Sequence, residues 1–429
     1  MKKKYFLNAN IIDPHNSIEE IGGLIINEEG KIEAVGKKVN TSNIPSREKF
    51  VDLKSKYIFP GIVDMRVFGG EPGYEYKENY RSLSEAALAG GVTSVVTMPN
   101  TKPVIDSVSI VDFIQRRGRD KSKNNIFPTA TLTKDTEGNN MTEFGLLNNK
   151  GIVGFTDGLK SVQSSRVMSR IIKSAYDFGC LVIQHAEDQE LSKGGMINDG
   201  IISTKLGIPG ISDLAEKIII ERDLSLLEAI NCRYHISQIS CKKSLDLIEF
   251  KKNNVAFTTG VSINNLALNE NDIGEFKTFL KLSPPLRTED DRISLIEGIN
   301  KNLIDVIVSD HKPEDEESKR LTFSQAATGA SGIETFLSLA LEQFHNGSIK
   351  LDKIVELITH NPAKILKINK GNLCIGADAD FCIIDINKPW VVKKENLLSK
   401  SKNTSIEGRK LQGKVTNTFV NGQELYKLK

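Results

Sequence analysis

Short apolar runs alternate along most of the chain with stretches that place apolar residues at helical spacing. Eight strands alternating with helices predict an α/β fold with a parallel sheet, and this count fits a closed (β/α)8 barrel. An open doubly wound sheet is the alternative, but no Gly-x-Gly-x-x-Gly follows the first strand. The expected strands are Ile58–Val67, Thr93–Met98, Ile126–Leu132, Ile152–Thr156, Leu181–Gln184, Arg233–Ser237, Val255–Val261 and Val306–Ser309. The expected helices include Ser82–Ala89, Ser165–Phe178, Leu214–Glu228 and Lys243–Lys252.

Both ends of the chain show a different pattern, in which short alternating segments are separated by turn residues. The N-terminal segments are Lys4–Ala9, Gly23–Ile26 and Ile32–Val35. The C-terminal segments are Phe381–Ile386 and Lys414–Val420, followed by an Asn421-Gly422 turn signal. We therefore predict one small β-sandwich domain formed by residues 1–53 and 369–429, beside a barrel formed by residues 54–368.

Composition and charge narrow the classes of function. The formal net charge of +2 gives no reason to expect nucleic acid or an anionic membrane as a partner. The apolar run after Lys2-Lys3-Lys4 is too short for a signal-peptide core, and no segment is long enough to cross a bilayer. Five cysteines without a Cys-x-x-Cys pair indicate reduced thiols. We therefore predict a cytoplasmic protein.

Side chains capable of chemistry gather at the predicted carboxyl ends of the strands, where barrels of this type hold their active sites. Three of the six histidines lie at these ends. Two imidazoles and a carboxylate can bind zinc with an open position for water, and a strand-eight aspartate would be the natural general base. The strand-end residues are Arg66, Phe68, Asn100, Lys134, Asp157, His185, His235, Ser262, Asp310 and His311.

Purely structural roles remain open for the same side chains. His185 could hydrogen-bond Glu187 or Asp188. His235 could pack under a loop, and Asp310 could cap the helix that follows it.

These residues, in this order, resemble the dihydroorotases of the amidohydrolase superfamily over nearly the whole chain. The resemblance implies a TIM barrel with a small β-sandwich built from both termini. It also implies closure of N-carbamoyl-L-aspartate to dihydroorotate in de novo pyrimidine (UMP) biosynthesis, with one or two zinc ions. The motifs that carry it are Pro60–Gly73, Ala89–Thr101, Phe155–Gly158, Gln184–Asp188, Lys281–Arg287, Ser309–Pro313, Asn361–Leu366 and Gly376–Asp385.

Carried over position by position, the resemblance gives an incomplete metal site. His185 and His235 match the family's second-metal histidines, and Asp310 matches its catalytic aspartate. The first-strand His-x-His is replaced by Arg66 and Phe68, neither of which can ligate a metal. The family's bridging aspartate falls on Gly158, and Asp157 lies one residue early, which points a strand side chain to the other face.

The positions that hold the substrate in the family have also changed. The arginine before Glu-Pro-Gly is Gly70 here, the asparagine of the Asn-Pro-Pro-Leu-Arg motif is Ser283, and a histidine after strand eight is Glu314. Asn100 remains from the carboxylate-holding set, and Arg66 is a candidate to replace part of the lost positive charge. A dicarboxylate substrate needs cationic, forked donors, so these changes remove attraction and add repulsion.

The first hypothesis is therefore a catalytically impaired member of the dihydroorotase family that acts as a structural partner of aspartate transcarbamoylase. It would work as a homo- or hetero-oligomer. One alternative is an active dihydroorotase with at most one zinc ion, held by His185, His235 and Asp157. Another is a different cyclic amidohydrolase of hydantoinase or allantoinase type, and a last one is a degraded copy without a role. Whether the chain is an enzyme stays open at this point.

Overall fold

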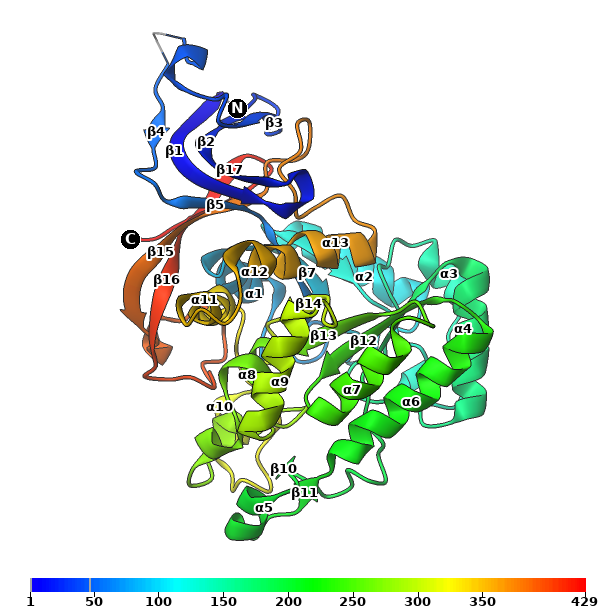
Figure 1. The fold of residues 1–429 in the computed structure, drawn as a ribbon. Coiled ribbons are helices and arrows are strands. Elements are labelled where there is room, and N and C mark those ends of the chain that lie inside the picture. Colours follow the sequence, from blue (N-terminus) through cyan, green and yellow to red (C-terminus); the bar gives the residue numbers. More distant parts are fainter. Residues whose placement is uncertain (1, 46–47) are drawn as a thin grey trace.

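The structure, a computed structural model, describes residues 2–45 and 48–429 and contains a closed barrel with one sheet beside it (Figure 1). The barrel strands are β6 (Ile62–Val67), β7 (Val92–Thr97), β8 (Asn125–Pro128), β9 (Leu181–Gln184), β12 (Arg233–Ile239), β13 (Thr258–Ser262) and β14 (Val306–Val308). They form two parallel runs, β6-β7-β8 and β9-β12-β13-β14. Isolated parallel bridges join the runs, because Phe155 pairs with Ala130 and Val182, and Val67 pairs with His311. The fold is the predicted TIM barrel, with its fourth strand reduced to the bridges at Phe155.

Helices cover the outside of the barrel, as the alternating pattern predicts. Helix α4 (Ser165–Phe178) has the predicted bounds, because the Ser164 hydroxyl caps its start and Gly179 ends it in the left-handed conformation. The other helices are α1 (Tyr80–Ala89), α2 (Val108–Lys121), α3 (Phe144–Asn148), α5 (Ile201–Leu206), α6 (Asp213–Ala229), α7 (Lys242–Lys251), α8 (Ile263–Ala267), α9 (Glu289–Asn300), α10 (Glu316–Arg320), α11 (Phe336–His345), α12 (Leu351–Ile358) and α13 (His360–Leu366). A small parallel pair, β10 (Ile197–Asn198) and β11 (Gly210–Ile211), lies near α5 at the lower end of Figure 1.

The two ends of the chain meet in one sheet. Its strands run in the order β17-β16-β15-β5-β1-β2-β3, and β4 also pairs with β1. The predicted turn at Asn421 and Gly422 joins β16 to β17, and both residues have positive φ angles of 50° and 73°. The strands are β1 (Lys4–Asp13), β2 (Ile18–Ile26), β3 (Ile32–Gly36), β4 (Val51–Asp52), β5 (Tyr57–Pro60), β15 (Phe381–Val391), β16 (Lys410–Val420) and β17 (Gln423–Lys427).

The first predicted strand, Ile58–Val67, is in fact two strands in different sheets. Its first half is β5, which pairs with β1 and β15, and its second half is β6 in the barrel. Gly61 separates them, and a Cβ atom there would lie 2.0 Å from Thr93 Oγ1. Both halves are apolar, so the sequence pattern alone does not reveal the break.

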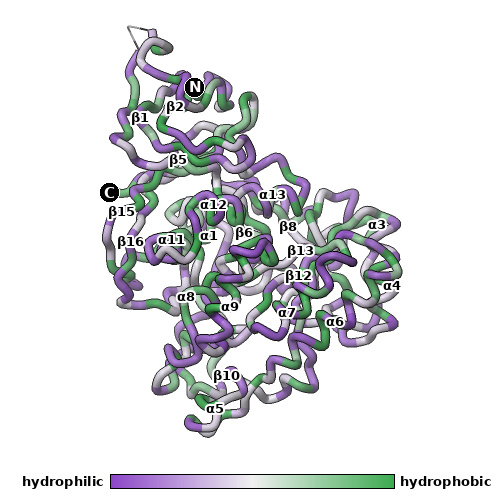
Figure 2. Tube along the Cα trace, viewed as in Figure 1, coloured by the Kyte–Doolittle hydropathy of each residue, from purple (hydrophilic) through white to green (hydrophobic). Residues whose placement is uncertain are grey.

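One apolar core extends from the barrel into the terminal sheet. Phe59, Cys382 and Val415 of the sheet belong to the same cluster of buried residues as Phe336 and Leu341 of α11. Figure 2 shows that apolar and polar residues alternate along the outer helices, as expected for helices with one face on a core.

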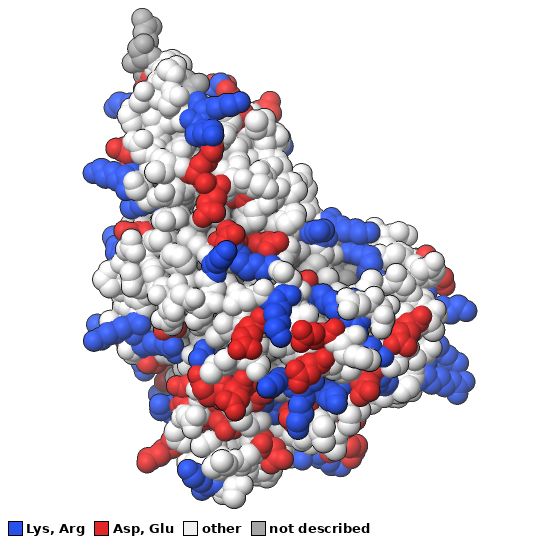
Figure 3. All heavy atoms as spheres, in the orientation of Figure 1, with Lys and Arg blue, Asp and Glu red and all other residues white. Residues whose placement is uncertain are grey.

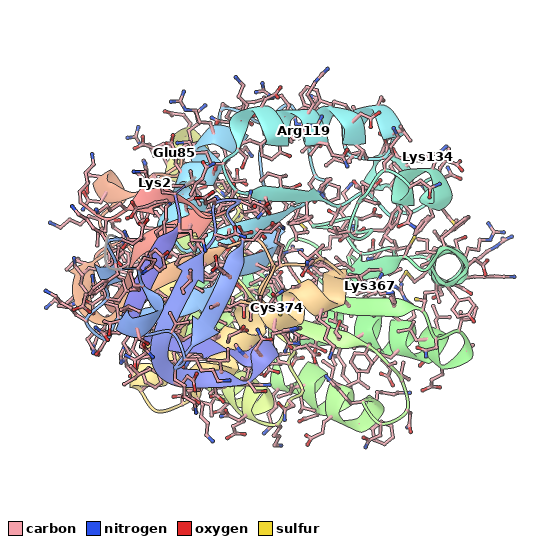
Figure 4. All side chains as sticks on the ribbon, turned by 90° about the horizontal axis from the view of Figure 1, so that it is seen from above. Lys2, Glu85, Arg119, Lys134, Lys367 and Cys374 are labelled. Atoms are coloured by element: carbon pink, nitrogen blue, oxygen red, sulfur yellow. The ribbon has the colours of Figure 1, made fainter. Side chains whose placement is uncertain are left out.

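The surface shows no strong segregation of charge on the face drawn in Figure 3, where both signs are interspersed. Seen from above, the blue strands of the terminal sheet lie to one side, and α2, which carries Arg119, lies on the outer rim (Figure 4). Among the residues described, no helix is long and apolar enough to cross a membrane.

Candidate active site

A buried ion pair occupies the carboxyl end of the barrel. Arg66, near the end of β6, is 1% exposed, and its Nε–H donates to Asp310 Oδ1 at 3.0 Å. Asp310 follows β14 and adopts a left-handed φ of 51°, a conformation that the surrounding contacts must impose on a residue other than glycine. Arg66 stands where the family resemblance puts a metal ligand, and Asp310 where it puts the catalytic residue. The two side chains therefore form an ion pair with each other.

Three residues from different parts of the barrel contact the rest of the Arg66 guanidinium. Its Nη1 donates to Ser237 Oγ of β12 at 3.1 Å and to the Gly158 carbonyl oxygen at 3.3 Å. Its carbon centre lies 5.6 Å from the centroid of the Phe68 ring, a cation–π distance. Nη2 has no hydrogen-bond partner in the described chain. Arg66 thus supplies a fixed positive charge at the centre of the site.

His185, which follows β9, pairs with neighbouring polar groups. Its Nε2 lies 3.6 Å from Glu187 Oε2 and 3.4 Å from Ser283 Oγ, whereas its buried Nδ1 lacks a partner among the described residues. Burial raises the pKa of Glu187, but the contacts with His185 and other neighbours outweigh burial and lower it overall. The contact with Glu187 is one of the structural roles that the sequence left open.

His235 lies one layer deeper in the barrel than His185. In the β9–β12 pairing its partner is Ile183, two residues before His185, and Ile183 belongs to an apolar cluster inside the barrel. The His235 Nδ1 lies 2.8 Å from Thr258 Oγ1 on β13. Burial lowers the pKa of His235 to about 3, so the imidazole is neutral at physiological pH.

Asp157 turns its carboxylate away from the centre of the site. Its Oδ1 accepts the backbone N–H groups of Leu132 and Thr133 at 2.8 and 3.0 Å, and its Oδ2 accepts the Thr133 hydroxyl at 2.6 Å. Burial raises the pKa of Asp157, and these hydrogen bonds oppose that shift. The carboxylate therefore holds the loop after β8, in line with the one-residue offset in the sequence.

These residues do not fit a zinc ion. Within residues 2–45 and 48–429, no three His, Cys, Asp or Glu side chains are placed to share a metal ion. Arg66 adds a repulsive charge, because a divalent ion 4 Å from a unit positive charge is disfavoured by about 8 kcal/mol at an effective dielectric constant of about 20. The permanent guanidinium cannot remove this repulsion by losing its proton.

A cavity of about 330 Å³ opens at the mouth of the barrel, and its lining includes Phe68 and Met98, which contact the Arg66 guanidinium. Glu314, at the position of the family's substrate-binding histidine, lines it and is 3% exposed. Its carboxylate accepts Lys77 Nζ at 2.6 Å and Lys312 Nζ at 2.8 Å. Two of the three lysines that line the cavity are thus paired with a carboxylate of the chain itself, and the third, Lys160, donates to the Thr136 carbonyl oxygen.

Two of the altered family positions are fixed by the backbone. Gly70 has a φ of 74°, and a Cβ there would lie 2.0 Å from the Glu78 carbonyl oxygen. Gly158 has a φ of 68°, and a Cβ there would lie 1.6 Å from Asn100 Oδ1. Larger residues at either position therefore require the surrounding chain to move.

Asn100 keeps its place at the edge of the same cavity but serves the fold. Its Nδ2 donates to the Asp157 carbonyl oxygen at 3.0 Å, and its buried Oδ1 has no partner in the described part of the chain. The side chain therefore closes over Gly158.

Sequence reasoning missed a second polar link at the barrel mouth. His311 Nδ1 accepts the N–H groups of Gly332 and Ile333, so its Nε2 carries the proton of the neutral ring and faces Glu78 Oε2 at 3.6 Å. Glu78 also accepts the Ser399 hydroxyl at 2.5 Å. No sequence pattern points to Glu78, because it lies in a loop. Ser237 and Lys312 lie at strand ends, where functional side chains are expected in this fold, so the sequence could have identified them.

A larger cavity, of about 530 Å³, lies at the other end of the barrel. Its lining includes Leu181, Arg233 and Thr258, which begin β9, β12 and β13. Chemistry in this fold collects at the carboxyl ends of the strands, so we place the candidate site at the smaller cavity.

Comparison with known sequences matches the reading from the motifs. The family described as "Dihydro-orotase-like" matches residues 55–244. The dihydroorotase of Ehrlichia canis (strain Jake) is 39% identical over 424 residues, which cover 98% of this chain and 94% of the relative. The dihydroorotase of Aquifex aeolicus (strain VF5) is 36% identical over 428 residues and covers both chains fully.

Comparison with solved structures shows the same fold. L-Hydantoinase from Arthrobacter aurescens superposes with a TM-score of 0.88 at 23% identity, covering 100% of this chain and 96% of that one. D-Hydantoinase from a Thermus species gives a TM-score of 0.82 at 22% identity, covering 99% and 95%. At these identities the likeness concerns the fold, whereas the sequence relatives extend over the whole chain. The chain belongs to the dihydroorotase family.

Proposed function

We propose that this protein is a member of the dihydroorotase family without dihydroorotase turnover, which serves pyrimidine biosynthesis as a structural partner of aspartate transcarbamoylase. The observation that carries the proposal is the Arg66–Asp310 pair. A general base must be able to turn toward the substrate, and here the Asp310 carboxylate is held at Oδ1 by the Arg66 Nε–H. The pair also places a permanent cation where the family resemblance puts a zinc ligand.

The mouth of the cavity supports the same conclusion. An acidic substrate would have to displace Glu314 from Lys77 and Lys312, and Glu314 is fixed on the chain at high effective concentration. Side chains of the protein thus occupy both charged positions of the site. Arg66 takes the place of a metal cation, and Glu314 takes the place of a substrate carboxylate. The fold around them is intact, which favours a retained structural role over a degraded copy.

The first experiment measures zinc content by elemental analysis and dihydroorotate hydrolysis on the same purified sample, with the Aquifex aeolicus relative assayed in parallel. We expect far less than one zinc per chain and no turnover above the blank. About one zinc per chain with turnover that disappears in His235→Ala would overturn the proposal and establish the one-zinc alternative. Hydantoin and allantoin are assayed on the same sample, and turnover of either without dihydroorotate turnover would establish the other amidohydrolase alternative.

The partner role is tested separately by co-purification with aspartate transcarbamoylase from the same cells. We expect the two proteins to elute together in size-exclusion chromatography as a complex larger than either alone. Separate elution at micromolar concentrations of both would contradict the partner role while leaving the absence of turnover untouched.

A further inference from the structure

The terminal sheet carries a groove of about 940 Å³ that is separate from the candidate active site. Strands β15, β16 and β17 and the segment 393–398 border it. Its walls are largely apolar: Val391 and Leu398 are 39% and 41% exposed, and Trp390 and Tyr426 are half-buried. Exposed apolar side chains grouped in one groove are typical of a binding surface.

The rim of this groove is strongly basic. Glu334 is the one acidic residue of the lining, and its carboxylate is already bonded to the backbone N–H groups of Leu398 and Ser399. Blue side chains along the left flank of Figure 3 lie over the region that β15 and β16 occupy in Figure 1. The lysines of the lining are Lys388, Lys393, Lys414, Lys427 and Lys429.

Lys414 makes the groove favour anionic ligands over flat aromatic rings. Its Nζ lies 3.4 Å from the centroid of the Trp390 ring, and the charge of Glu334, which also lines the groove, favours its protonated form. Burial lowers the pKa of Lys414 to about 8, so an incoming anion would stabilise its charged form. Because the ammonium covers this face of Trp390, a flat ring cannot stack there, which disfavours a nucleobase.

We propose that this groove binds an acidic segment of a partner protein whose carboxylates alternate with apolar side chains. The carboxylates would pair with Lys414 and the rim lysines, and the apolar side chains would lie on Trp390 and Tyr426. Strand β17 is at one end of the sheet order, so its outer edge can accept an extended segment. The identity of the protein that carries this segment rests on the proposed partner role. The binding of an acidic segment in the groove does not.

Trp390 is the single tryptophan of the chain, so its fluorescence reports binding in this groove directly. The probe is an acetylated eight-residue peptide of alternating Glu and Leu, titrated into the full-length protein. We expect a saturable change in emission that weakens as salt is added. Lys414→Gln and Lys427→Gln should each weaken the affinity about tenfold, whereas Lys205→Gln, which changes an exposed lysine of α5 remote from the groove, should leave it unchanged.

The inference would be overturned by the absence of a saturable change, by an equal response to a peptide of alternating Lys and Leu, or by equal affinities in Lys414→Gln and Lys205→Gln. Saturation by inorganic phosphate or ATP at the same concentration as the peptide would identify a small-anion site and would also overturn it. If aspartate transcarbamoylase co-purifies equally with the native chain and with Lys414→Gln, the groove is not its docking site, although the partner role stands.

Discussion

Arg66 and Asp310 are a buried ion pair whose members cannot be removed independently. We expect Arg66→Met to lower the free energy of unfolding by about 3–5 kcal/mol, because it leaves the Asp310 carboxylate buried without its cation. The lost hydrogen bonds to Ser237 and the Gly158 carbonyl add to this cost. Urea unfolding followed by circular dichroism measures the change.

The control for this prediction is the double variant Arg66→Met, Asp310→Asn. Removing both charges should restore much of the lost stability, since a neutral pair in the same place carries no unpaired charge. If the double variant is no more stable than Arg66→Met, the pair does not hold the site together in the way proposed.

Asp64 lies near the same ion pair and makes the stability of the protein depend on pH. It is fully buried, and burial raises the pKa of its carboxyl from the ordinary value of 3.8 to about 6. The folded protein therefore binds this proton more tightly than the unfolded chain, and the free energy of unfolding should fall as pH rises from 4 to 6. About two pKa units correspond to about 3 kcal/mol for this group.

The measurement compares the native chain with Asp64→Asn in urea at pH 4.5, 5.5, 7 and 8. The stability of the native chain relative to the variant should fall between pH 4.5 and 7 and then remain level to pH 8. A constant difference across this range would show that Asp64 titrates alike in both states.

At the scale of elements, the sequence predicts helices best where their ends carry capping residues. Ser164 and Gly179 bracket α4, and its predicted bounds agree with the structure. The strand Ile152–Thr156 is reduced to bridges at Phe155, because neighbouring strands rather than its own residues decide how much backbone is paired. Local apolar patterning does not contain that information.

The sequence predicts which residues lie at the site but not which side chains pair with each other there. The strand-end rule selected Arg66, His185 and Asp310 from the sequence. It does not show that Arg66 reaches Asp310, which is 244 residues away in the chain, or that Asp157 turns to backbone amides. Such pairings depend on the registers of strands and on side-chain rotamers, which only the closed barrel fixes.

Glu314 links two loops at the barrel mouth, the one after β6 and the one after β14. We expect Glu314→Gln to create an anion site, because Lys77 and Lys312 lose their carboxylate partner beside the cavity. Malonate at about ten times its dissociation constant should then add about 1.4 kcal/mol to the free energy of unfolding.

The matched control is Glu316→Gln, which neutralises an exposed glutamate of α10 that pairs with Arg320. Unfolding in urea with and without malonate compares the three proteins. An equal effect of malonate on Glu314→Gln and Glu316→Gln would mean that the two lysines do not bind the anion together.

At the scale of the molecule, the barrel and the terminal sheet form one structural unit. The chain passes from β5 in the sheet to β6 in the barrel across Gly61 alone. The Thr418 hydroxyl of β16 donates to the Leu88 carbonyl oxygen of α1, and the Ser338 hydroxyl of α11 donates to the Gly413 carbonyl oxygen. A shared core and these crossing hydrogen bonds mean that neither part keeps its buried surface if the other unfolds.

We therefore predict that both parts unfold in one transition. Trp390 lies in the terminal sheet, whereas the helices that dominate far-ultraviolet circular dichroism surround the barrel, so two probes follow the two parts separately. In urea, the tryptophan fluorescence and the circular dichroism should change with the same midpoint, as cooperative unfolding requires. The variant Leu341→Ala, which cuts the shared core beside Gly413, should lower both midpoints together. A fluorescence change that precedes the circular dichroism change, or a variant that shifts only one of them, would show that the terminal sheet folds independently of the barrel.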